Sequence, residues 1–167
     1  MPDPTSSRHS MQWWFVKVFC ELALIPFTLD RYFYFFFDQW FTVPALIPQA
    51  LILTGGSISL YHYYYLRGQN DNIAMPKVLV MDQGLFRRAR HPMYFGDLLV
   101  ILGFFLFAAN YLTMSLAIIG FLSIKKQALI EDDHLKTIFG ESFHKWACST
   151  NLLLPHIKAS GSMKVDA

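Results

Sequence analysis

The stretch Arg87-Arg88-Ala89-Arg90-His91-Pro92-Met93-Tyr94-Phe95-Gly96 sets dense positive charge against the longest apolar run of the chain, from Leu98 through Ile124. Proline is favoured at the first position of a helix, and the residue before a proline is disfavoured in the helical conformation. We therefore predict that a membrane helix begins at Pro92, with His91 at or near its N-cap. The free N–H groups and positive dipole of such a helix end favour a bound anion.

A basic flank beside an apolar segment has a simpler interpretation, because lysine and arginine are enriched on the cytoplasmic side of membrane helices. Three arginines would be enough to fix the orientation of the helix in this way. The added His-Pro-x-Tyr sequence is not needed for that purpose. The pattern therefore favours a ligand site over a topology signal alone.

The composition indicates a single-domain integral membrane protein with an all-α fold over residues 1–167. The chain is 54% hydrophobic and 17% aromatic, and its apolar residues come in long blocks. The net charge of +2 gives no argument for nucleic acid. The two cysteines, Cys20 and Cys148, predict neither a disulfide framework nor a metal site.

Four membrane helices are expected, two in the N-terminal half followed by a C-terminal hairpin. Their predicted ranges are 11–29, 43–66, 92–109 and 112–130, and Asn110-Tyr111 interrupts the hairpin. Residues 1–10 and 159–167 have the composition of flexible tails. The aromatic stretch 30–42 is typical of a connector at headgroup depth. Residues 67–89 are expected to form an irregular loop that includes a turn at Asp82-Gln83-Gly84.

Within these helices, Lys17 and Glu21 have i, i+4 spacing and are expected to form an ion pair on one helix face. A structural pair, or snorkelling of these side chains toward the membrane interface, is favoured over a functional role. Gly55 and Gly56 predict close helix packing. The last helix should continue beyond the membrane as far as Gly140, a residue type that commonly ends helices, before an amphipathic piece.

The basic residues predict the topology. With four crossings they fall on one side of the membrane, and the positive-inside rule then places both termini and the site in the cytoplasm. The residues concerned are Arg8, Lys77, Arg87, Arg88, Arg90, Lys125 and Lys126. The hairpin also brings Arg90-His91-Pro92 and Glu131 to the same face.

At that face a cationic helix start meets the carboxylates of Glu131-Asp132-Asp133. These acids could simply form a solvated helix face. Beside the basic stretch, they would suit a ligand that carries both a carboxylate and an ammonium, as the methionine end of S-adenosylmethionine does. Methyl transfer requires alignment and exclusion of water rather than a metal or a nucleophilic triad, and the sequence shows neither. A Gly-rich dinucleotide-binding fingerprint is also absent.

The stretch Arg90-His91-Pro92-Met93-Tyr94-Phe95-Gly96 resembles the Arg-His-Pro-x-Tyr-x-Gly signature of the isoprenylcysteine carboxyl methyltransferase family. That family belongs to a wider group of membrane methyltransferases that includes phospholipid N-methyltransferases. The resemblance covers about residues 79–155, the motif-bearing catalytic half. It extends to an approach segment, Leu79 to Phe86, to Glu131-Asp132 where the family has Glu-Glu, and to a closing Leu154-Pro155.

The resemblance implies that S-adenosylmethionine is bound by matching positions. These are Val80, Met81, Phe86, His91, Pro92, Met93, Tyr94 and Glu131. Phe86 stands where a cofactor-contacting tyrosine is usual, so a hydroxyl contact is lost. Gln127 stands where prenylcysteine enzymes place a substrate-binding arginine. Gln127 and Arg90 are therefore the candidates on the acceptor side of the reaction, and Lys126 or Arg90 would have to supply the missing charge.

The leading interpretation is an integral membrane methyltransferase that uses S-adenosylmethionine on a lipophilic acceptor entering from the bilayer. A prenylated thiol-acid, an amine-bearing phospholipid and another small hydrophobic nucleophile remain open as acceptors. Two alternatives are a membrane reductase with a similar C-terminal hairpin and a nicotinamide cofactor, and a membrane protein without enzymatic activity. Membrane lipids are expected partners, whereas nucleic acid and metal are not.

Overall fold

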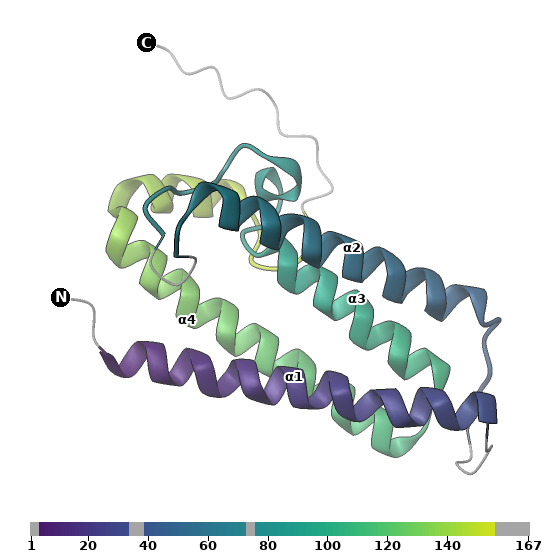
Figure 1. The fold of residues 1–167 in the computed structure, drawn as a ribbon. Coiled ribbons are helices and arrows are strands. Elements are labelled where there is room, and N and C mark those ends of the chain that lie inside the picture. Colours follow the sequence, from purple (N-terminus) through teal and green to yellow (C-terminus); the bar gives the residue numbers. More distant parts are fainter. Residues whose placement is uncertain (1–3, 34–38, 73–75, 156–167) are drawn as a thin grey trace.

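The computed structural model describes residues 4–33, 39–72 and 76–155, which form a bundle of α-helices. The helices are α1 (Pro4–Phe33), α2 (Leu46–Gln69), α3 (Pro92–Phe107) and α4 (Tyr111–Ser149), and a short 3-10 helix, η1 (Gly84–Arg87), precedes α3. The long helices run alongside one another, with the start of α3 near the end of α2 (Figure 1). The described residues contain no strand apart from an isolated bridge between Ala89 and Asn151, so the predicted all-α class is confirmed.

Two of the described helices are long and apolar enough to cross a membrane. They are α4 and the part of α1 from Met11 to Asp30. The 16 residues of α3 form a shorter apolar helix. The four expected helices are therefore present, and length and composition support two of them as candidate membrane spans.

The start of α1 differs from the prediction that residues 1–10 form a flexible tail. The structure continues the helix back to Pro4, while residues 1–3 and the predicted tail at 159–167 lie outside the described residues. Proline at a first helical position loses no hydrogen bond, because its missing N–H would be unpaired there. A polar segment can therefore extend an apolar helix by two turns.

The predicted aromatic connector lies partly outside the described residues, because α1 reaches Phe33 and residues 34–38 are not described. Its second part contacts the corner between α3 and α4. The backbone N–H of Trp40 donates to the carbonyl of Ala109 at 2.8 Å, and the ring of Trp40 meets that of Tyr111 edge-on, with centroids 4.5 Å apart. These contacts attach the connector to the corner of the hairpin.

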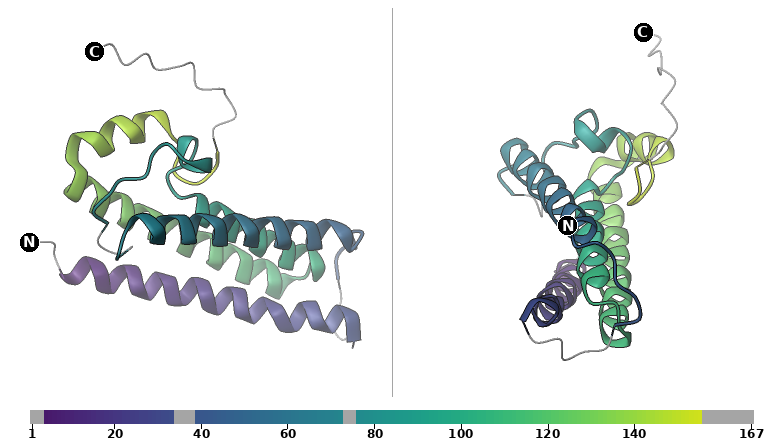
Figure 2. Two further views of the ribbon diagram at one scale, coloured as in Figure 1. Left: turned by 45° about the horizontal axis from the view of Figure 1, so that its top comes forward. Right: turned by 90° about the vertical axis from the view of Figure 1, so that its right-hand side faces the viewer.

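Helices α2 and α3 lie side by side in all views (Figures 1 and 2), and glycines permit their close approach. A Cβ atom on Gly96 would lie 2.5 Å from the backbone oxygen of Gly55, a distance that no side chain could occupy. The predicted packing role of Gly55 is confirmed. That of Gly56 is wrong, because a Cβ atom there would meet nothing within 4 Å. The pairing buries only one of the two adjacent glycines because neighbouring helical residues point in different directions.

The C-terminal hairpin begins and ends close to the predicted residues. Asn110 caps α4 by accepting hydrogen bonds from the backbone N–H groups of Leu112 and Thr113, and the Thr113 hydroxyl accepts one from the Asn110 N–H. The predicted stop at Gly140 is a kink with φ of 52°, a conformation that glycine adopts without strain. Beyond it, residues 141–149 turn back toward η1 (Figure 2).

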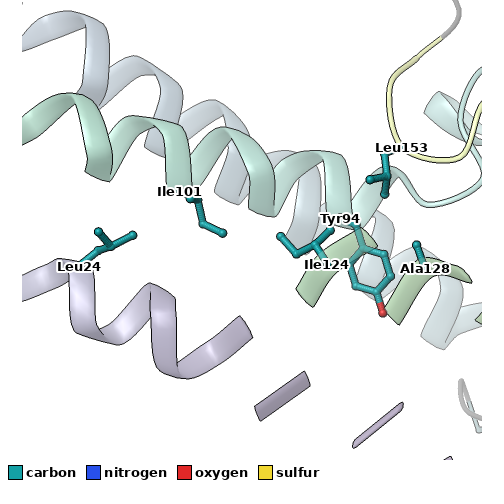
Figure 3. Close-up of a cluster of buried hydrophobic side chains, with 6 residues drawn as sticks. All are labelled: Leu24, Tyr94, Ile101, Ile124, Ala128 and Leu153. Carbon is teal, nitrogen blue, oxygen red and sulfur yellow. The ribbon is translucent and has the colours of Figure 1, made fainter. Parts of the chain in front are cut away.

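A buried apolar cluster joins α1, α3, α4 and the C-terminal segment (Figure 3). Its members are Leu24, Tyr94, Ile101, Ile124, Ala128 and Leu153. Tyr94 is the one member with a polar group, and its hydroxyl points away from α3 on the side of Ala128 (Figure 3). The core therefore ends at a polar group, at the end of the bundle where α3 begins.

Candidate cofactor and acceptor site

The site is built on the start of α3, where the sequence predicted it. His91 is the N-cap residue and Pro92 follows at the first helical position. The backbone N–H groups of Arg90 and His91 donate to the carbonyls of Asn151 and Leu152, at 2.8 and 3.1 Å. The side chain of His91 does not cap its own helix. It is therefore available to reach the neighbouring helix α4.

The imidazole of His91 is buried and lies between two carboxylates of α4. Its Nε2 atom is 2.8 Å from Oδ1 of Asp132, and its Nδ1 atom is 3.4 Å from Oε2 of Glu131. Each ring nitrogen thus faces an acidic oxygen, an arrangement that favours the doubly protonated imidazolium. The predicted meeting of His91 and Glu131 occurs, and Asp132 shares in it.

Two further side chains converge on Glu131. The hydroxyl of Tyr94 donates to Oε1 of Glu131, and Nε2 of Gln127 donates to the same oxygen at 3.3 Å. The other amide atom of Gln127, Oε1, is buried and has no hydrogen-bond partner within the described residues. The side chain of Glu131 itself is 36% exposed. An acceptor oxygen thus remains available beside a partly open carboxylate.

Arg90 holds the C-terminal segment rather than extending into open space. Its Nε atom donates to Asp132 at 2.9 Å, and Nη1 donates to the carbonyls of Ala147 and Thr150 at 3.0 and 2.7 Å. With the backbone bonds to Asn151 and Leu152, these contacts fix the start of α3 against the end of α4. The structure therefore gives Arg90 a clamp function at the site.

The remaining predicted cofactor residues fall into two groups. Pro92 is buried and Met93 half-buried at the start of α3. The other three belong to a separate apolar cluster that includes Val80, Met81, Phe86, Phe143 and Trp146. In that cluster, Nε1 of Trp146 donates to the carbonyl of Phe86 at 3.0 Å. The cluster ties η1 to the segment after Gly140 and forms an apolar neighbour to the charged group.

The two carboxylates govern the charge of His91. Burial lowers the pKa of an imidazole, but hydrogen bonds from His91 to Asp132 and Glu131, together with their negative charges, outweigh burial and raise its pKa to about 8. Near neutral pH the site then contains two cations, Arg90 and His91, and two anions, Glu131 and Asp132. Such a balanced group suits a zwitterionic ligand.

The pH dependence of stability follows from this shift. The His91 pKa is raised above its unfolded value of 6.5, so its contribution is fully present below about pH 6.5 and is lost as pH rises through about 8. We expect about 2 kcal/mol of stability to disappear between pH 6.5 and 9. Thermal unfolding in detergent across this range would measure it. The variant His91→Gln should lose this pH dependence, and an unchanged profile in that variant would contradict the assignment.

Sequence reasoning missed a polar contact between helices and assigned the wrong partner to Lys17. The predicted pair of Lys17 with Glu21 is replaced by Lys17 with Asp97, whose Nζ and Oδ2 atoms are 2.6 Å apart. Asp97 also accepts a hydrogen bond from the hydroxyl of Ser59 at 2.8 Å. A contact along one helix is weak, and the buried carboxylate of α3 outcompetes it. The sequence feature that could have indicated this contact is Asp97 itself, a lone aspartate at the start of an apolar run.

Comparison with known proteins identifies the family of this chain. Searches of curated proteins and of solved structures found no significant match. The family model for phospholipid methyltransferases matches residues 45–142. That segment begins just before α2 and ends just after Gly140, so it contains His91, Tyr94, Gln127, Glu131 and Asp132 but not α1. The chain belongs to the phospholipid methyltransferase family, which is related to the isoprenylcysteine carboxyl methyltransferases.

Proposed function

We propose that this protein is an integral membrane methyltransferase that transfers a methyl group from S-adenosylmethionine to a lipophilic acceptor entering from the bilayer. The observation that supports this most is the convergence of His91, Tyr94, Gln127 and Glu131 at the start of α3. Membership of a methyltransferase family supports the same reaction class. The positive-inside rule supports a cytoplasmic site and cytoplasmic termini.

The residues present fit the methionine end of S-adenosylmethionine. Its carboxylate would find a cationic partner in His91, and its ammonium would find an acceptor in Glu131. The start of α3 adds the positive end of a helix dipole, which favours an anionic group. When bound, the cofactor supplies an electrophilic methyl group.

The residues around this position then orient the reactants. Tyr94 and Gln127 fix the Glu131 carboxylate through one shared oxygen, so that the second oxygen, Oε2, faces His91. The apolar cluster that contains Phe86 and Trp146 keeps water from one side. Alignment of nucleophile and methyl group in a site that excludes water is the main requirement of this reaction.

The most direct test is a calorimetric titration of the purified full chain with S-adenosylhomocysteine and, separately, with NADPH. Binding of S-adenosylhomocysteine alone would support the proposal. Binding of NADPH alone would instead favour a reductase, and binding of neither would favour a membrane protein without this enzymatic activity.

The acceptor proposed here is an amine-bearing lipid rather than a prenylated thiol-acid. Gln127 is buried, and its neutral amide cannot form the bidentate ion pair that an arginine makes with a carboxylate. Its free oxygen can accept a hydrogen bond from an N–H group. The phospholipid methyltransferase family points to the same class of acceptor.

The variant Gln127→Arg is therefore expected to shift preference toward acceptors with a free carboxylate, by about tenfold or more relative to amines. The measurement is methyl transfer from labelled S-adenosylmethionine to matched lipophilic acids and amines. Cofactor affinity should change less than this ratio. Robust turnover of a prenylcysteine by the unmodified protein, insensitive to substitution at Gln127, would contradict the assignment of Gln127 to the acceptor side.

A further inference from the structure

Helix α1 contributes charged groups to the interior of the bundle although it lies outside the segment matched by the family model. The Lys17 side chain is 10% exposed and its ion-pair partner Asp97 is 12% exposed. One oxygen of Asp97 contacts Lys17 and the other accepts from Ser59. The positive charge of Lys17 is thus already neutralised, and both oxygens of Asp97 are occupied.

Glu21 takes part in neither of these two contacts. It follows Lys17 by one helical turn on the same face of α1, and it interacts electrostatically with both Lys17 and Asp97. Its Oε1 atom is buried and has no hydrogen-bond partner in the described part of the chain. A buried polar atom without a partner is costly, and ionisable residues inside membrane helices commonly mark ligand pathways.

The charges of this cluster indicate what is missing. Lys17 supplies one positive charge and already pairs with Asp97, so the cluster offers no further cation to the Glu21 carboxyl group. The unpartnered atom is an acceptor, so the missing group must also donate a hydrogen bond. A primary or secondary ammonium has both properties.

The cluster lies next to the proposed reaction site. The Nζ atom of Lys17 is 5.5 Å from the centroid of the Tyr94 ring, and the hydroxyl of the same ring donates to Glu131. Tyr94 therefore has the α1 cluster on one side and the proposed cofactor-binding carboxylate on the other. A headgroup held beside Lys17 would be separated from that carboxylate by a single aromatic side chain.

We propose that Glu21 binds the ammonium headgroup of the lipid acceptor, and that the Lys17–Asp97 pair fixes α1 at the depth this requires. That this lipid is the methyl acceptor rests on the proposed function, whereas the binding of an amine-bearing lipid does not. Helix α1 thus supplies a specificity-determining residue from outside the matched family segment. Selectivity is for headgroups that carry a positive charge and at least one N–H donor.

The test is calorimetric binding of short-chain phospholipids to the purified full chain in detergent. The probes are phosphatidylethanolamine, phosphatidylcholine and phosphatidylglycerol with identical acyl chains. The unmodified protein is expected to bind the ethanolamine lipid about tenfold or more tightly than the glycerol lipid. The choline lipid, which has no N–H donor, should also bind more weakly than the ethanolamine lipid.

The variant Glu21→Gln should abolish the preference for ethanolamine over glycerol. The matched control Glu141→Gln removes an exposed carboxylate after Gly140 and should leave the preference intact. Equal binding of the ethanolamine and choline lipids by the unmodified protein, or a preference that persists in Glu21→Gln, would overturn the inference and make Glu21 a buried structural acid. If Glu21→Gln does not fold, equal binding of the ethanolamine and choline lipids by the unmodified protein would still overturn the inference.

This outcome is separable from the proposed function. Binding of S-adenosylhomocysteine is measured on the same samples and should change less than the lipid preference does in Glu21→Gln, because Glu21 is outside the charged group at the start of α3. If Glu21→Gln loses the lipid preference and the unmodified protein does not bind S-adenosylhomocysteine, the lipid site is supported and the methyltransferase proposal is rejected.

Discussion

Replacing Glu131 with alanine is expected to weaken S-adenosylhomocysteine binding by about ten- to a hundred-fold, and His91→Ala should do the same. Each change removes a charged partner from a buried group in which His91 lies between Glu131 and Asp132. Loss of Glu131 also releases Tyr94 and Gln127, which both donate to its Oε1 atom. Isothermal titration of the folded variants with S-adenosylhomocysteine gives the two affinities directly.

The control for this experiment is Asp133→Ala, which removes the neighbouring carboxylate on the same helix. Asp133 is exposed, whereas Glu131 and Asp132 are partly buried against α3. The control should bind S-adenosylhomocysteine as the unmodified protein does. Unchanged affinity in both His91→Ala and Glu131→Ala, with the helical content retained, would remove the charged group at the start of α3 from the cofactor site.

The features predicted correctly from the sequence are those that depend on local chemistry. Pro92 marks the start of α3, Asn110 lies at the break between α3 and α4, and Gly140 ends the straight part of α4. Each of these residues has a backbone preference that holds in almost any surroundings. The convergence of His91 and Glu131 also followed from the sequence, because a hairpin must return its two open ends to the same face.

The features that were missed depend on which helices become neighbours. The choice of Asp97 over Glu21 as the partner of Lys17 requires α1 to lie against α3, and no periodicity within α1 contains that information. The clamp formed by Arg90 likewise requires the chain after Gly140 to turn back, so that the carbonyls of Ala147 and Thr150 come within reach. The Arg-His-Pro motif identified Arg90 as a site residue, but it did not predict which groups Arg90 contacts.

The variant Lys17→Met is expected to destabilise the protein by about 3–5 kcal/mol, because it leaves the Asp97 carboxylate buried without a cation. The double variant Lys17→Met, Asp97→Leu should recover most of this loss, since an apolar pair of similar size can replace a buried ion pair. Denaturant or thermal unfolding in detergent, combined in a double-mutant cycle, separates the pair energy from the packing of each residue.

The chain offers a matched pair for comparison. Lys77 and Asp71 form an ion pair of 3.2 Å whose side chains are 79% and 88% exposed, in contrast to 10% and 12% for Lys17 and Asp97. Water solvates both partners of the exposed pair, so Lys77→Met should leave the unfolding midpoint almost unchanged. Equal effects of Lys17→Met and Lys77→Met would mean that Asp97 is solvated or protonated in the bundle, and the contact between α1 and α3 would then depend on Leu24 and Ile101 rather than on charge.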